Sequence, residues 1–140
     1  MNVSALFHLA FPVRDLKESR AFYGDLLGCS EGRSSENWVD FDFFGHQLVA
    51  HLAPEECVSV STSEVDREEV PVRHFGAVLS MKDWDGLAAK LKAAAIHFII
   101  APQIRFKGQV GEQATMFFLD PSGNALEFKA FADMHQVFAK

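Results

Sequence analysis

Two apolar runs, each followed directly by a helical pattern, organise this chain. The first run covers residues 6–13 and the second covers residues 72–79. After the first run, Asp15 can cap a helix whose apolar residues have helical spacing, and Gly28 can end it. After the second run, a helix is predicted from about Asp83 through Leu91. The repeated order predicts one structural unit that has been duplicated.

Alternation of apolar and polar residues predicts half-buried strands after each helix. In the first half, the alternating segments are 38–44 and 47–52, with a turn at Gly45. In the second half, strands are predicted near 97–101, 114–119 and 125–131. The sequence Asp120-Pro121-Ser122-Gly123 predicts a tight turn between the last two strands. The predicted fold class is therefore α+β, with two βαβββ modules in a single domain.

The length of 140 residues fits one domain with a sizeable core. The first module is predicted at about 1–53 and the second at about 72–131. Residues 54–71 are polar and acidic, and we interpret them as a loop that links the modules. A short C-terminal helix is expected within 132–140.

Composition narrows the classes of partner. The formal charge is −6 and no basic cluster is present, which argues against nucleic acid. The apolar runs are too short to span a membrane, and no signal-peptide pattern opens the sequence. Cys29 and Cys57 cannot form a disulfide framework. We therefore expect a cytoplasmic protein that acts on a small molecule.

The strongest chemical signal is a histidine at the matched place in each half, His8 and His74. In a duplicated unit, such positions face each other, which favours a metal site over two histidines of the core. Glu127 lies in an otherwise apolar strand and needs a partner, which a metal would provide. The alternative is an ion pair of Glu127 with Arg73 or Arg105. We expect His97 and His135 to lie on the surface.

The arrangement resembles the vicinal oxygen chelate superfamily, which includes glyoxalases, bleomycin-resistance proteins and extradiol dioxygenases. The resemblance covers nearly the whole chain. Its most specific motif is the segment 120–127, Asp-Pro-Ser-Gly-Asn-Ala-Leu-Glu. The other matching segments are the 8–16 opening, the helix end from Phe22-Tyr23 to Leu27-Gly28, and His74 on its strand.

The resemblance implies metal ligands on the first and last strands of each half, here His8, His51, His74 and Glu127. Three imidazoles and one carboxylate suit Zn, Fe, Ni, Mn or Co better than Mg or Ca. For His51 the assignment is open, because the family commonly has a glutamate or another polar residue there and His46 is a nearby rival.

Several reactions fit such a site. Four protein ligands would suit a lyase or isomerase that binds vicinal oxygens, with Glu127 as general base. A facial triad of His8, His74 and Glu127 would suit an extradiol-type dioxygenase. Addition to fosfomycin would need a denser cationic pocket than Arg33, Arg105 and Lys107 supply. A fourth possibility is a metal-free protein that binds a drug or another small ligand.

The substrate pocket is expected to have aromatic and apolar walls. The candidates are Trp38, Phe41, Phe43, Met116 and Phe118. The segment 105–113 carries cations and two glycines and could form a mobile lid, in which Arg105 or Lys107 would bind a substrate carboxylate. The alternative is an ordinary solvated loop. Because this family pairs modules within one chain or between two chains, we also expect a homodimer.

Overall fold

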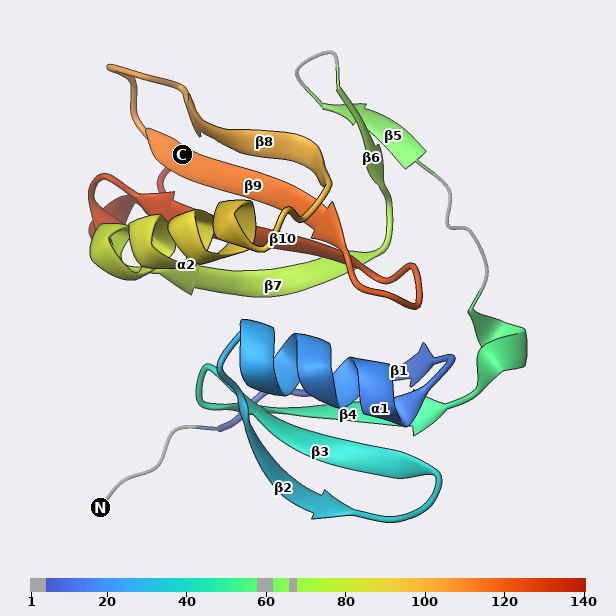
Figure 1. Cartoon of the computed structure of the whole chain (residues 1–140). Helices are drawn as coiled ribbons and strands as arrows, with labels where there is room; N and C mark the ends of the chain where they lie inside the picture. The colour runs from blue at the N-terminus through green and yellow to red at the C-terminus, as the bar shows by residue number, and fades with distance from the viewer. Residues whose placement is uncertain (1–4, 58–61, 66–67) are drawn as a thin grey trace. The chain divides into compact units, whose positions relative to one another are not determined.

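The computed structural model of the chain describes residues 5–57, 62–65 and 68–140, and it divides into two compact units (Figure 1). The first unit comprises residues 1–58 together with 120–124, and the second comprises 59–119 and 125–140. Each unit contains a four-stranded mixed sheet. The predicted fold class, with two βαβββ modules, is confirmed.

The sheet of the first unit has the strand order β1-β4-β3-β2. Strand β1 pairs with β4 in parallel, and the remaining neighbours are antiparallel. The strands are β1 (His8–Val13), β2 (Ser30–Ser34), β3 (Trp38–Phe43) and β4 (His46–Leu52). Strand β2 was not located from the sequence, because all five of its residues are exposed and it carries no apolar alternation.

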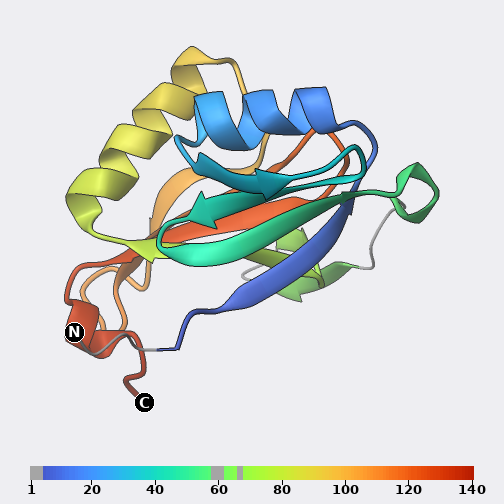
Figure 2. The ribbon, with the colours of Figure 1, turned by 90° about the horizontal axis from the view of Figure 1, so that it is seen from below.

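One helical segment covers one face of this sheet (Figure 2). It begins as α1 (Leu16–Ser19), continues as the π-helical η1 (Arg20–Leu26), and Gly28 follows with a φ of 78°. The predicted cap is confirmed, since Asp15 Oδ1 accepts a hydrogen bond from Glu18 N at 2.8 Å. The buried Tyr23 ring packs between Phe11 and Phe41, with centroid distances of 5.4 and 5.5 Å. This contact joins the helical segment to the sheet.

The sheet of the second unit has the order β7-β10-β9-β8, again with the first strand parallel to the last. Its elements are β7 (His74–Leu79), α2 (Met81–Ala93), β8 (Phe98–Arg105), β9 (Gln113–Leu119) and β10 (Ala125–Phe131). Helix α2 begins two residues before the predicted start, because Ser80 Oγ caps it by accepting from Asp83 N at 3.1 Å. Trp84 Nε1 donates to Phe128 O at 2.9 Å and fastens the helix to the sheet.

The predicted linker contains more secondary structure than expected. It holds the short 3₁₀ helix η2 (Pro54–Glu56) and a hairpin of β5 (Thr62–Val65) and β6 (Glu68–Pro71). The acidic residues of this segment led to the prediction of a loop. The two strands form through pairing of their backbones, which composition does not indicate. Residues 58–61 and 66–67 lie outside the described part. The predicted C-terminal helix is a single 3₁₀ turn, η3 (Met134–Gln136).

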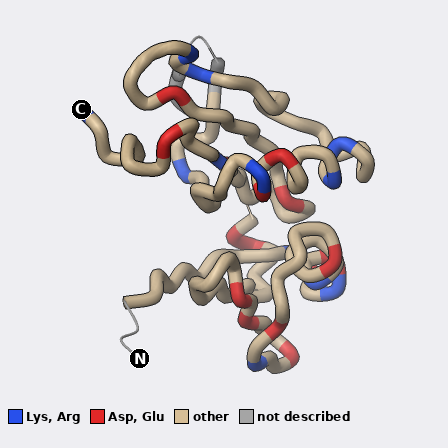
Figure 3. The backbone as a smooth tube through the Cα atoms, turned by 90° about the vertical axis from the view of Figure 1, so that its left-hand side faces the viewer, with Lys and Arg blue, Asp and Glu red and all other residues tan. Residues whose placement is uncertain are grey.

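Charged positions of both signs occur throughout each unit (Figure 3). His97 and His135 are exposed, as predicted. Among the described residues, every helix is too short or too polar to cross a bilayer.

Candidate functional site

The parallel pairing of β7 with β10 brings His74 and Glu127 together. His74 lies opposite Ala125 in the register, and Glu127 lies opposite Gly76. Since side chains two residues apart on a strand share a face, Glu127 lies on the same face as His74. The gap between His74 Nε2 and Glu127 Oε1 is 3.5 Å. Two atoms with free electron pairs thus approach each other from neighbouring strands.

The other nitrogen of His74 is already occupied. His74 Nδ1 lies 2.8 Å from the carbonyl oxygen of Pro71. Because a carbonyl oxygen only accepts hydrogen bonds, Nδ1 carries the proton and Nε2 of the neutral ring holds the lone pair. The edge of the Phe117 ring packs on the imidazole at a centroid distance of 4.7 Å. The orientation of His74 is therefore set by both a hydrogen bond and packing.

Glu127 is only 9% exposed and has its own polar partners. Its Oε2 accepts a hydrogen bond from Thr115 Oγ1 at 2.5 Å, and Lys129 Nζ lies 3.9 Å from Oε1. A buried carboxylate needs such partners to remain charged. With Thr115 holding one oxygen, Oε1 is the oxygen that faces the His74 ring.

Gly76 allows the backbone of β10 to approach β7 closely at this point. A Cβ at residue 76 would lie 1.6 Å from the carbonyl oxygen of Glu127 and 2.6 Å from its carbonyl carbon. The obstacle is backbone, which cannot rotate away as a side-chain end can. The absence of a side chain at 76 therefore determines where Glu127 sits.

The turn before β10 belongs to the first unit. Asp120 Oδ1 accepts from Ser122 N and Asn124 N, and Asp120 Oδ2 accepts from Asn124 Nδ2 and from the Tyr23 hydroxyl at 2.7 Å. Asn124 Nδ2 also donates to Pro12 O at 2.8 Å. Burial is the main cause that raises the pKa of Asp120 above its ordinary value, although these hydrogen bonds oppose it. The predicted turn is confirmed. Its side chains take part in a buried network of hydrogen bonds.

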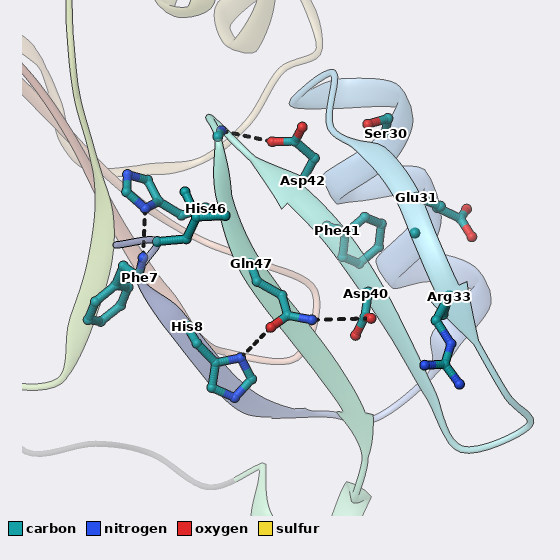
Figure 4. A pocket seen from close by; sticks show the side chains of 13 residues that line it. Phe7, His8, Ser30, Glu31, Arg33, Asp40, Phe41, Asp42, His46 and Gln47 are labelled. Carbon is teal, nitrogen blue, oxygen red and sulfur yellow. Dashed lines mark hydrogen bonds between the residues drawn. The ribbon is translucent and has the colours of Figure 1, made fainter. Parts of the chain in front are cut away.

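In the first unit, His8 lies at the start of β1, in a pocket of about 560 Å³ on the exposed side of the sheet (Figure 4). Its Nδ1 is 2.9 Å from Gln47 Oε1. His46 lines the same pocket, and its Nδ1 accepts a hydrogen bond from Phe7 N at 2.9 Å.

The register separates His51 from His8. His8 lies opposite Gln47, whereas His51 lies opposite Pro12, four residues further along. At strand spacing this separation is about 13 Å. Matching His8 and Gln47 with His74 and Ala125 places Val49 at the position that Glu127 occupies in the second sheet. The first unit thus has an apolar residue where the second has its carboxylate.

Within the described part of the chain, no three His, Cys, Asp or Glu side chains gather closely enough to hold a metal. His74 and Glu127 form a close pair in the second unit, and His8 belongs to the first unit.

Comparison with known proteins identifies the family to which this fold belongs. The family model of the Glyoxalase/Bleomycin resistance protein/Dioxygenase superfamily matches residues 5–128. The chain belongs to this superfamily. The resemblance inferred from the sequence motifs is thereby confirmed.

Solved structures agree with the membership. A glyoxalase/bleomycin resistance protein/dioxygenase from Alicyclobacillus acidocaldarius is 38% identical, with a TM-score of 0.76, over 95% of this chain and 96% of that chain. The fosfomycin resistance protein FosX of Listeria monocytogenes is 17% identical, with a TM-score of 0.72 over 96% and 98% of the two chains. Lactoylglutathione lyase of Agrobacterium tumefaciens is 23% identical, with a TM-score of 0.61 over 92% and 95%. The last two show the shared fold alone.

In this superfamily member, Met116 and Phe118, two residues proposed as pocket walls, lie in the interior, whereas Phe41 is among the residues that line the pocket beside His8. Phe41 is 1% exposed, and Met116 and Phe118 are fully buried. Alternation turns Met116 and Phe118 to the face opposite Glu127, where Phe118 stacks on Phe128 at 5.8 Å. Phe43 is also buried, while Trp38 is half-buried. The face of Glu127 is lined instead by Thr115 and Phe117.

The segment after β8 is held by hydrogen bonds. Arg105 ends β8, and its guanidinium lies 5.1 Å from the centre of the Phe106 ring. Lys107 is exposed in the following turn. The N–H of Gly108 donates to Glu112 Oε1 at 2.7 Å, and the N–H of Gly111 donates to Gln136 Oε1 at 2.9 Å.

Thr115, Gln47 and Asp40 of this superfamily member are not among the site residues predicted from the sequence. Each takes part in a contact between strands: Thr115 with Glu127, Gln47 with His8, and Asp40 with Gln47. The available signal was a polar residue on the same face as a candidate ligand. Choosing among such residues requires the strand register, which alternation does not provide.

Proposed function

We propose that this chain is a divalent-metal-dependent enzyme that binds a small molecule through two adjacent oxygen atoms. The observation that carries the proposal is the pair formed by His74 Nε2 and Glu127 Oε1, 3.5 Å apart. The second atom of each group is occupied, by Pro71 O and by Thr115 Oγ1 respectively. Metal-binding histidines and carboxylates characteristically have such outer partners.

The proposed ligands are His8, His74 and Glu127. Two imidazole nitrogens and one carboxylate oxygen suit Zn, Fe, Ni, Mn or Co. We leave His51 out of the ligand set, because the register puts Val49 at the place matched to Glu127. A site with three protein ligands has room for both oxygens of a bidentate substrate.

A bound metal would supply a Lewis acid that holds the substrate oxygens and stabilises charge that develops on them. The chain's own residues would do the rest. In a lyase or isomerase, Glu127 would accept a proton from substrate carbon as the general base. Lys129 Nζ, 3.9 Å from Oε1, and the Thr115 hydroxyl would hold the carboxylate in position for that transfer.

An extradiol-type ring-cleaving dioxygenase is the second candidate. One specific observation favours it, namely Val49 at the position matched to Glu127. A catechol and dioxygen together need three free positions, which only a set of three protein ligands leaves on a six-coordinate ion. Under this alternative, Glu127 would stay a ligand and would not act as a base.

Substrate contacts are proposed for Trp38, Arg105 and Lys107. The side chain of Trp38 is half-buried, and a cation at 105 or 107 would suit a substrate carboxylate. Replacing Arg105 and Lys107 separately by alanine should raise the Michaelis constant and leave the metal content unchanged. An unchanged Michaelis constant would remove both residues from the proposal.

The experiment that tests the function is metal analysis of the full chain. After Co²⁺ loading and desalting, we expect stoichiometric metal in the wild type and its loss in His8→Ala, His74→Ala and Glu127→Gln. His51→Ala is the matched control and should keep its metal. A wild type that binds no transition metal would overturn the proposal and favour a metal-free ligand-binding protein.

Substrate screening then separates the two reactions. Oxygen uptake with catechols would support the dioxygenase. Exchange of a carbon-bound proton in 2-oxoaldehyde adducts by the metal-loaded wild type would support the lyase or isomerase. We also propose a homodimer, and a monomeric mass in sedimentation equilibrium would contradict that part.

A further inference from the structure

Three polar side chains on neighbouring strands form a row in the first unit (Figure 4). His8 comes from β1, Gln47 from β4 and Asp40 from β3, which are consecutive in the sheet order. His8 Nδ1 lies 2.9 Å from Gln47 Oε1, and Gln47 Nε2 donates to Asp40 Oδ2 at 3.4 Å. The row therefore runs from the carboxylate through the amide to the imidazole.

The chemistry of Asp40 decides the direction of every hydrogen bond in the row. An ionised carboxylate only accepts, so the amide group of Gln47 must present its nitrogen to Asp40. The amide oxygen then faces His8, and an oxygen of this kind also only accepts. His8 Nδ1 must therefore carry a proton, which leaves the lone pair of the neutral ring on Nε2.

We propose that Gln47 and Asp40 are positioning residues, which select the His8 tautomer whose Nε2 can bind a metal. The metal in this statement rests on the proposed function, whereas the tautomer does not. His74 has the same tautomer by a different route, through the carbonyl oxygen of Pro71. The residue matched to Gln47 in the second sheet is Ala125, which has no polar side chain. The second sheet therefore lacks a counterpart of the row that runs from Asp40 through Gln47 to His8, which we call the relay.

The other charged groups of the pocket leave Asp40 available for this role. Glu31 is paired with Arg20 at 3.0 Å, and Asp42 Oδ1 accepts from Gly45 N at 2.8 Å. Gly32 lets β2 pass close to Asp40, since a Cβ at residue 32 would lie 3.3 Å from Asp40 Cβ. Arg33 lines the same pocket.

The first test reads the tautomer directly in the metal-free full chain. Long-range proton–nitrogen NMR spectra, recorded where the rings are neutral and assigned with His8→Gln, distinguish the two tautomers. We expect a proton on Nδ1 of His8 in the wild type and a mixture in Asp40→Asn, because an asparagine can donate or accept. Gln47→Leu should give a mixture as well. The double variant Asp40→Asn with Gln47→Glu should restore the wild-type tautomer, since the amide introduced at position 40 would donate to the carboxylate introduced at position 47.

The second test measures Co²⁺ affinity by competition with a chelating dye. Gln47→Leu should weaken binding roughly tenfold, as loss of an outer partner commonly does, and Asp40→Asn should weaken it less. Asp42→Asn is the matched control on the same strand, and its retained oxygen can still accept from Gly45 N. The double variant should recover affinity, which loss of folding would not allow.

The outcomes separate the two proposals. A wild type that binds no Co²⁺ would remove the proposed metal function, while the NMR spectra would still decide the relay. A proton on Nε2 of His8 in the wild type would overturn the relay. A tautomer unchanged in both Asp40→Asn and Gln47→Leu would do so too, even if metal binding were strong.

Discussion

Replacing Gly76 by alanine is the sharpest test of how this chain places its buried carboxylate. The new Cβ would lie 1.6 Å from the carbonyl oxygen of Glu127, 2.6 Å from the carbonyl carbon and 3.2 Å from the nitrogen. Carbon and oxygen atoms in ordinary contact lie 3.4 Å or more apart. Strands β7 and β10 would therefore have to separate locally by about 2 Å.

The loss of stability expected for Gly76→Ala depends on which atoms the new Cβ meets. Adding a methylene to a packed site costs about 1–3 kcal/mol, and backbone atoms place this site at the upper end. Loss of chain entropy in the unfolded state offsets about 0.4–1 kcal/mol of that cost. We expect Gly76→Ala to lower the free energy of unfolding by about 2–3 kcal/mol. For a chain of this length, the midpoint of thermal unfolding should fall by roughly 6–12 °C.

The assay is urea and thermal unfolding followed by circular dichroism, with Gly86→Ala as the matched control. Gly86 is exposed in helix α2, and a Cβ there would have no neighbour within 4 Å. The same substitution should therefore stabilise the protein by about 0.5–1 kcal/mol. Co²⁺ affinity provides a second measurement, and Gly76→Ala should weaken it because Glu127 is displaced. Equal stability of Gly76→Ala and the wild type would refute the close approach of the two strands.

Three further measurements concern buried groups. The chain has one tyrosine, and burial followed by the charge of Asp120 raises the pKa of Tyr23 well above 10.0. An ultraviolet titration should therefore show tyrosinate only as the protein unfolds at alkaline pH. The stability that the protonated Tyr23 contributes is lost as pH rises through the pKa of the folded state. Reversible ionisation near pH 10 without unfolding would contradict this. The raised pKa of Asp120 means that the folded state holds its proton more tightly, so stability should fall as pH rises just above 3.8, and this slope should vanish in Asp120→Asn. Burial raises the pKa of Cys29 to about 12, so a thiol reagent should modify Cys57 alone until the protein unfolds, and two fast-reacting thiols in the native state would be inconsistent with the structure.

Much of the fold could be predicted, because alternation and capping are local signals. Asp15 and Gly28 bounded the first helical segment, and strand β10 was predicted at 125–131. Strand β2 and the hairpin of β5 and β6 could not be found in this way. The exposed residues of β2 carry no apolar pattern, and pairing of the backbone forms both elements.

Less of the site could be predicted from the sequence, because alternation shows on which face of a strand a residue lies but not how the strand is aligned with its neighbour. His51 shares a face with Val49, yet it lies four residues from the partner of His8. Alternation also gives two faces without saying which one a helix covers. Met116 and Phe118 were selected on that basis, and both are fully buried on the covered side.

The turn at Asp120–Asn124 has a consequence for how the protein is made. It belongs to the first unit, where Asp120 accepts from the buried Tyr23 hydroxyl and Asn124 donates to Pro12 O. During synthesis, residues 59–119 must leave the ribosome before the turn exists. At ordinary rates of translation, that interval is on the order of ten seconds or less. Throughout it, the Tyr23 hydroxyl lacks its Asp120 partner, so the buried polar network of the first unit can be completed only after residue 124 has been synthesised.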